Sequence, residues 1–199
     1  MLPLPVDMSR VTSILYPGQV RGDYKAHGGF RFDQPGQTTS VNVVAPIAGT
    51  LLRASRYLAS CEIQDTFDFV NDCGIMFRFG HLRDLAARFQ AVADTLPAPI
   101  ELDSRSTPVS GVTVAAGEIV GTGVGLRDSA RNVFVDYGVY DLRQRNRSSQ
   151  DPTWLAAHDN DTHAYAVCWF DLLSPADAAL VRSLPSADFQ MGKTSDYCK

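Results

Sequence analysis

The chain of 199 residues has little of what marks several common protein classes. No apolar run reaches the roughly 20 residues that cross a bilayer, so we expect no transmembrane helix. The formal net charge is −4, and without a basic excess the chain is not expected to bind nucleic acid. Internal repeats and low-complexity tracts are absent, which argues against a solenoid. The first residues lack the basic segment of a secretory signal, so an extracytoplasmic mature form and a cytoplasmic protein both stay open.

Cysteine is scarce, and its four copies form none of the CxxC pairs of a thiolate zinc site. Cys61 and Cys73 flank an expected hairpin and could pair across it. Cys168 and Cys198 could join the tail to the segment before it. Four separate thiols fit equally well, and an even count agrees with an oxidising compartment without proving one.

Apolar residues are plentiful. They make up 45% of the chain, enough for a substantial core, and the length suits one domain over residues 1–199. Short segments rich in β-branched and aromatic residues alternate with polar ones, a pattern typical of strands joined by turns. The sequence therefore predicts a mainly β, antiparallel fold.

Two segments have helical spacing instead. Apolar residues recur at that spacing over 82–95, which predicts a peripheral helix there. A second helix is expected over 175–184, with Ser174 as its N-cap. Before it we expect a polar surface loop over 142–160 and a strand over 163–173.

The strand expected over 132–141 organises the rest of the chain. It alternates with period 2 and has apolar residues on both faces, so we place it in the centre of a sheet. Asp136 lies within this apolar segment. Because an unpaired buried carboxylate is costly, Asp136 needs a cation, a metal ion or several hydrogen-bond donors.

A set of short motifs occurs in a fixed order along the chain. They are His27-Gly28-Gly29-Phe30-Arg31, Val44-Ala45-Pro46-Ile47-Ala48-Gly49, Phe79-Gly80-His81-Leu82, Val114-Ala115-Ala116-Gly117-Glu118-Ile119-Val120-Gly121 and Phe134-Val135-Asp136-Tyr137-Gly138-Val139. The set resembles the LytM/lysostaphin-like zinc metallopeptidases (duplicated hybrid motif), which cut cell-wall peptide cross-bridges. The match covers about residues 14–142, and it implies an antiparallel LytM-like β-sheet sandwich with a C-terminal strand–helix extension beyond it.

The resemblance also assigns roles to residues of this chain. His27 stands at the position of the first zinc ligand and Asp136 at that of the third. Arg31 occupies the position of the family's acidic ligand. His81 matches a catalytic histidine that assists the attacking water and the oxyanion, whereas Phe134 replaces the other one. Only His27 and His81 keep the family's residue type.

Arginine cannot be deprotonated in a protein and cannot ligate zinc. We therefore expect the guanidinium of Arg31 to take the place of the metal and to pair with Asp136. Loss of the Lewis acid and of a histidine at Phe134 would stop hydrolysis by the family mechanism. The resulting hypothesis is a catalytically degenerate domain, a pseudoenzyme without a cofactor. It would bind a peptide, glycan or protein partner in the former active-site groove.

Alternatives stay open. His27, His81 and Asp136 form a two-His, one-carboxylate set that could hold zinc in a hydrolase with a rebuilt site. Asp33, displaced by roughly 7 Å along the same strand face, could be a further ligand if the strand bulges. His163 is expected to have a packing role at the start of an apolar strand, with a place in the groove as the alternative. A purely structural or interaction domain without a groove is the third hypothesis, and the oligomeric state stays open.

Overall fold

The computed structural model describes residues 1–33, 40–127, 133–160, 162–187 and 191–199. Within them, ten strands form one sheet and two more form a separate hairpin, so the mainly β, antiparallel fold is confirmed. No helix in these ranges is long and apolar enough to cross a membrane, which agrees with the sequence.

The strands are β1 (Ser13–Leu15), β2 (Gln19–Arg21), β3 (Asp23–Lys25), β4 (Gly28–Arg31), β5 (Ser40–Val44), β6 (Gly49–Ala59), β7 (Glu62–Val70), β8 (Ile75–Leu85), β9 (Thr107–Pro108), β10 (Thr113–Val114), β11 (Ile119–Val124) and β12 (Phe134–Asp141). The helices are α1 (Ala87–Ala93), α2 (Pro152–Ala157) and α3 (Pro175–Ser183), with short 3-10 helices η1 (Met8–Arg10), η2 (Ser148–Gln150), η3 (His163–Tyr165) and η4 (Trp169–Leu172).

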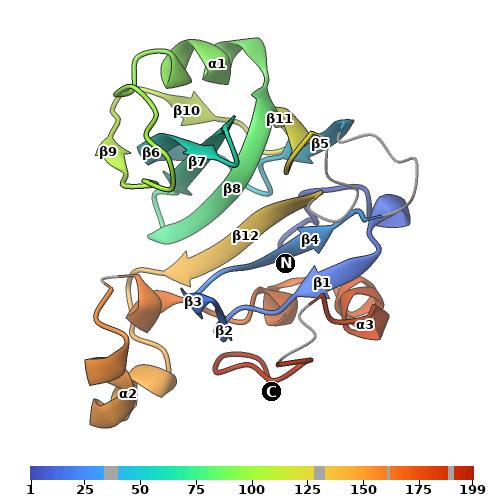
Figure 1. Cartoon of the computed structure of the whole chain (residues 1–199). Helices are drawn as coiled ribbons and strands as arrows, with labels where there is room; N and C mark the ends of the chain where they lie inside the picture. The colour runs from blue at the N-terminus through green and yellow to red at the C-terminus, as the bar shows by residue number, and fades with distance from the viewer. Residues whose placement is uncertain (34–39, 128–132, 161, 188–190) are drawn as a thin grey trace.

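The main path of the large sheet runs β1-β4-β12-β8-β7-β6-β10. The strand predicted over 132–141 is β12, and it lies inside the sheet between β4 and β8, as expected; its first predicted residue, Asn132, is outside the described part of the chain. β8 pairs with β12 along its first half and with β11 along its second half. It therefore links the lower strands to the upper ones (Figure 1).

The core is aromatic and lies on one face of β12. Tyr137 is fully buried, and its ring contacts those of Phe30, Phe79 and Trp169 at centroid distances of 5.8, 5.6 and 5.2 Å. Val135 and Val139 share that face and are buried as well. The alternate residues of the strand point to the opposite face, and this second face carries the polar residues considered below.

The helix predicted over 82–95 is too long. β8 continues to Leu85, and α1 begins only at Ala87. His81 has a left-handed backbone (φ 57°), and the register between β7 and β8 shifts next to it. These irregularities break the period-2 pattern, so the apolar residues that follow imitate helical spacing. The predicted helix over 175–184 is present as α3, with the hydroxyl of Ser174 accepting a hydrogen bond from the amide of Asp177.

The strand predicted over 163–173 is wrong. That segment folds into η3 and η4, and η4 buries the adjacent residues Trp169 and Phe170 together, which an extended strand could not do on one face. The loop predicted over 142–160 contains η2 and α2. Asp151 caps α2 and Pro152 begins it, a start signal that the polar composition hid.

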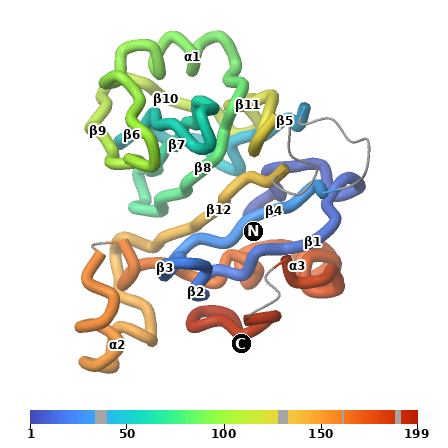
Figure 2. The backbone as a smooth tube through the Cα atoms, in the orientation of Figure 1, coloured from blue at the N-terminus to red at the C-terminus, as the bar shows by residue number. Residues whose placement is uncertain are grey.

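The tail is attached at several points. Cys168 and Cys198 form a disulfide, one of the two pairings that the sequence allowed, whereas Cys61 and Cys73 are free and exposed. The side-chain amide of Gln19 donates to the carbonyls of Gly192 and Thr194. The last residues therefore run beside the β2–β3 hairpin, where Figure 2 shows the red end of the chain.

Candidate functional site

The polar face of the sheet is centred on Asp136. In the register of β12, Asp136 lies opposite Gly29 of β4 and Gly80 of β8. Position 29 cannot carry a side chain unless the backbone shifts, because an added Cβ would lie 2.3 Å from the carbonyl oxygen of Val135. Glycine on both neighbouring strands leaves the carboxylate without a directly adjacent side chain, and two imidazoles use that space.

Asp136 meets both retained histidines. Its Oδ2 lies 3.1 Å from Nε2 of His27 and 3.6 Å from Nε2 of His81. The side chains of Asp136, His27 and His81 are 13%, 15% and 24% exposed, so the cluster is mostly covered but still open to solvent. The structure thus brings together the three residues that the motifs singled out.

The pKa values in this cluster follow from burial and charge. Burial tends to raise the pKa of Asp136, but the charges of His27 and His81 and the hydrogen bond from His27 hold it well below its ordinary value. Burial lowers the pKa of His81, and the negative charge of Asp136 offsets this only in part. The folded state therefore favours the ionised form of Asp136 and the neutral form of His81.

His81 is held by residues of other strands. Its Nδ1 lies 3.4 Å from the hydroxyl of Tyr57 on β6, and its ring packs against that of Phe134 at 4.4 Å. Burial, and then the charge of Asp136, raise the pKa of the Tyr57 hydroxyl, which stays protonated. Sequence reasoning missed Tyr57 because no motif marks it, and only the register of β6 with its neighbours brings it here.

Arg31 does not replace the metal in the way that we expected. Its Nε donates to Oδ2 of Asp33, and its guanidinium carbon lies 5.4 Å from the centre of the Phe134 ring. Asp33 is two residues along the same face, so this local pair forms at little entropic cost. Oδ1 of Asp33 also accepts from the amide of Val133, so Asp33 belongs to this pair and not to the Asp136 cluster. The predicted Arg31–Asp136 pair is wrong, and the carboxylate has histidine partners instead.

The residues present do not fit the zinc site of the resembled family. A guanidinium and an aromatic ring, those of Arg31 and Phe134, stand where that family has an acidic ligand and a histidine. In the ranges that the structure describes, no group of three or more His, Cys, Asp or Glu side chains is arranged to hold a metal ion. A rebuilt site made of His27, His81 and Asp136 stays a prediction.

A second ionic cluster lies on neighbouring strands. Asp68 of β7 is fully buried and accepts hydrogen bonds from Arg78 at 2.6 and 2.7 Å and from Arg53 at 2.7 Å. Burial tends to raise the pKa of Asp68, but the hydrogen bonds and charges of Arg78 and Arg53 lower it. Arg78 lies opposite Gly138, two positions from the Asp136–Gly80 pair. The sequence carries no signal for this cluster, because its members belong to three separate strands.

His163 lies in an aromatic cluster. Its ring packs against that of Tyr24 at 5.1 Å and lies 6.2 Å from that of His158. Burial, followed by the charge of His158, lowers its pKa. His163 is half-buried in this cluster, and both the packing role and a place in the groove stay predictions.

Neither a protein-family model nor a curated protein matches this sequence. The likeness to LytM-type peptidases consequently depends on the ordered motifs, and the function is argued from the side chains themselves.

Proposed function

We propose that the chain is a catalytically degenerate LytM-like domain that binds a peptide, glycan or protein ligand over the face of His27, Asp136 and His81. The observation that supports this most directly is the 3.1 Å contact between His27 and Asp136. Asp136, which stands at the family's third ligand position, is paired with the imidazole of His27. Arg31, at the acidic-ligand position, pairs with Asp33.

The same face keeps the means to bind a ligand. Within the described part of the chain, both histidine contacts of Asp136 go to Oδ2, and Oδ1 accepts no hydrogen bond. Oδ1 can therefore take an N–H or O–H donor from a ligand. The rings of Phe134 and Tyr57 lie beside His81; Tyr57 is buried, and the partly exposed ring of Phe134 offers apolar contact area. Amide and hydroxyl donors beside apolar groups are the chemistry of peptides and glycans.

Calorimetric titration with soluble peptidoglycan fragments, such as a disaccharide tetrapeptide, tests this proposal. We expect saturable binding without cleavage, and Asp136→Asn should weaken it about tenfold or more, because Oδ1 loses its charge. Asp84→Asn is the matched control, since the carboxylate of Asp84 is 39% exposed and pairs with Arg83 and Arg127 instead of His27 and His81. If no fragment binds the folded protein, the proposal fails and a purely structural domain is favoured.

One observation favours a second candidate, a zinc-dependent peptidase or other hydrolase with a rebuilt site. Nε2 of His27 and Nε2 of His81 both approach one oxygen of Asp136, and imidazole and carboxylate are zinc ligands. Stoichiometric zinc that disappears in His27→Ala, together with cleavage of a cross-bridge peptide, would replace the first proposal by this one. Conversely, if the first proposal holds, the double variant Arg31→Asp, Asp136→His should gain zinc affinity over the parent chain.

A further inference from the structure

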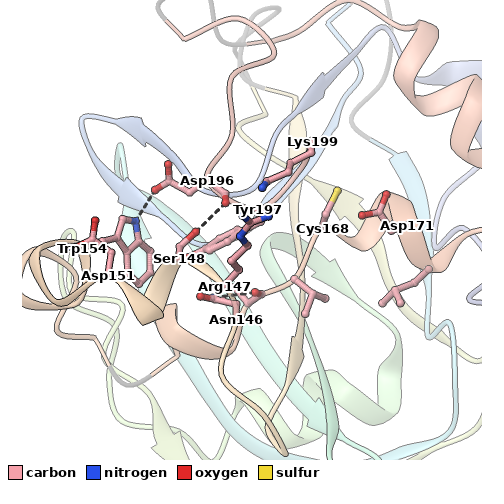
Figure 3. Close-up of a pocket in the computed structure, with 13 residues that line it drawn as sticks. Asn146, Arg147, Ser148, Asp151, Trp154, Cys168, Asp171, Asp196, Tyr197 and Lys199 are labelled. Atoms are coloured by element: carbon pink, nitrogen blue, oxygen red, sulfur yellow. Dashed lines mark hydrogen bonds between the residues drawn. The ribbon is translucent and has the colours of Figure 1, made fainter.

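A separate cavity of about 620 Å³ lies between the segment around η2 and α2, the segment that leads to η4, and the C-terminal tail. Its wall includes Arg147, Trp154, Val167, Leu172, Tyr197 and Lys199 (Figure 3). None of the residues of the Asp136 face lines it. A volume of this size is in the range of small-molecule sites.

The tail forms a fixed wall of this cavity. The hydroxyl of Ser148 donates to the carbonyl of Asp196 at 2.8 Å, and the indole of Trp154 donates to Oδ2 of Asp196 at 2.7 Å, as the dashed lines in Figure 3 show. The disulfide between Cys168 and Cys198 joins this wall to the one opposite. The cavity is therefore built by cross-links between segments distant in sequence.

The acidic residues of the wall are all engaged by the protein. Asp151 accepts the amides of Thr153 and Trp154 at the start of α2. Asp171 pairs with Arg182. Asp196 accepts from the indole of Trp154 and also from the hydroxyl of Tyr24 at 2.8 Å.

The basic residues of the wall differ. Over the ranges described above, the side chains of Arg147 and Lys199 form neither an ion pair nor a hydrogen bond. In Figure 3 they enter the cavity from different segments, Arg147 from the loop before α2 and Lys199 from the tail. Both residues are exposed, and an anion that binds between them is attracted by both charges. The guanidinium also offers a fork that matches a carboxylate.

Other residues of the wall offer apolar surface to the uncharged part of a ligand. Val167 and Leu172 are partly buried apolar residues that pack against the core, and Trp154 and Tyr197 contribute aromatic rings to the wall. A ligand that fills the volume must cover these groups while its charge meets the cations.

We propose that this cavity binds a small carboxylate with an apolar body, such as an N-acylated amino acid or the end of a short peptide. The proposal is independent of the function assigned to the Asp136 face. The carboxylate lies between Arg147 and Lys199, and the apolar part lies against Val167 and Leu172.

The test is a titration of the full oxidised chain with N-acetyl-leucine, followed by the NMR signals of the two indole N–H groups. Trp154 lines the cavity and Trp169 is fully buried in the core, so Trp169 is the internal reference. We expect the Trp154 signal to move saturably and that of Trp169 to stay. N-acetyl-leucinamide, which lacks the charge, should bind about tenfold more weakly or worse. Inorganic phosphate, which lacks the apolar body, should bind at least as weakly as the amide.

Arg147→Gln should weaken the binding of N-acetyl-leucine about tenfold. Arg145→Gln is the matched control, because Arg145 is exposed on the same loop and does not line the cavity. Three results would each overturn the proposal. The first is that the Trp154 signal shows no saturable shift. The second is that N-acetyl-leucine binds no more tightly than N-acetyl-leucinamide, or no more tightly than phosphate. The third is that Arg147→Gln leaves the affinity for N-acetyl-leucine unchanged.

Discussion

The sheet face around Asp136 and the cavity beneath the tail use charge in opposite ways. On the sheet face the charged groups have partners within the chain, with His27 on Asp136, Arg78 on Asp68 and Arg31 on Asp33. In the cavity, Arg147 and Lys199 are basic residues for which the described structure provides no partner. Paired buried charges maintain the fold, and their loss destabilises it. An unpaired cation contributes little to the fold and is available to a ligand. Substitutions of the paired charges in the first region should therefore lower stability, at Asp136 in addition to the effect on ligand binding. Substitutions of the cations in the second region should affect binding with little effect on stability.

The largest effect is expected from Asp68→Asn. Asp68 is fully buried, and the side chains of its partners Arg53 and Arg78 are only 24% and 20% exposed. Removing the carboxylate leaves buried guanidinium charge without its anion, so the free energy of unfolding should fall by about 3–5 kcal/mol. Urea unfolding measures it. Asp103→Asn is the control, because its partner Arg105 is 86% exposed, and it should leave the unfolding midpoint unchanged. Similar losses for both variants would contradict the comparison.

The next effect concerns the tail. The Cys168–Cys198 disulfide spans 30 residues, and the double variant Cys168→Ser, Cys198→Ser should lower the free energy of unfolding by about 3 kcal/mol. The indole signal of Trp154 should move at the same time, since its acceptor Asp196 lies on the released tail. Urea unfolding and NMR check the two results. Cys61→Ser with Cys73→Ser should change neither, because both thiols are free and exposed.

A smaller effect should appear as the pH falls. The pKa of His81 is below its ordinary value of 6.5 in the folded state, so below pH 6.5 the unfolded chain binds more protons and stability declines. The pKa of Asp136 is also lowered from its ordinary value of 3.8, so its contribution is present above that pH and is lost as the pH falls further. Protonation of His81 and protonation of Asp136 therefore both lower the free energy of unfolding as the pH falls. Thermal unfolding from pH 8 to pH 3 measures the decline, and Asp136→Asn should flatten its acidic end. A parent curve that is flat below pH 6.5 would contradict this account.

The smallest effect sharpens the contrast. Arg147→Gln should change the free energy of unfolding by less than about 0.5 kcal/mol, because no ion pair or hydrogen bond of the described chain is lost. Urea unfolding of this variant beside Asp68→Asn gives the direct comparison. A loss of several kcal/mol in Arg147→Gln would show that the cation has a structural partner.

Much of the fold could be predicted where a local pattern is sufficient. The alternation around Tyr137 predicted the central strand, and Ser174 predicted the start of α3. Prediction failed where the backbone departs from its regular period. The left-handed residue His81 concealed the second half of β8, and the 3-10 turn at Trp169 resembled a strand in composition.

The site was predictable in the same uneven way. The motifs selected His27, His81 and Asp136, and the structure places them together. The partner of Arg31 was predicted wrongly, because a carboxylate two residues away competes better than one on another strand. The sequence did not reveal the contribution of Tyr57, since strand register cannot be read from a single chain.

His81 has a consequence beyond its contacts. A non-glycine residue at φ 57° carries a conformational penalty of roughly 1–2 kcal/mol, which glycine would avoid. The chain accepts this strain at the position whose imidazole faces Asp136. Backbone geometry alone would favour glycine at position 81, whereas the imidazole that stands there helps to lower the pKa of Asp136.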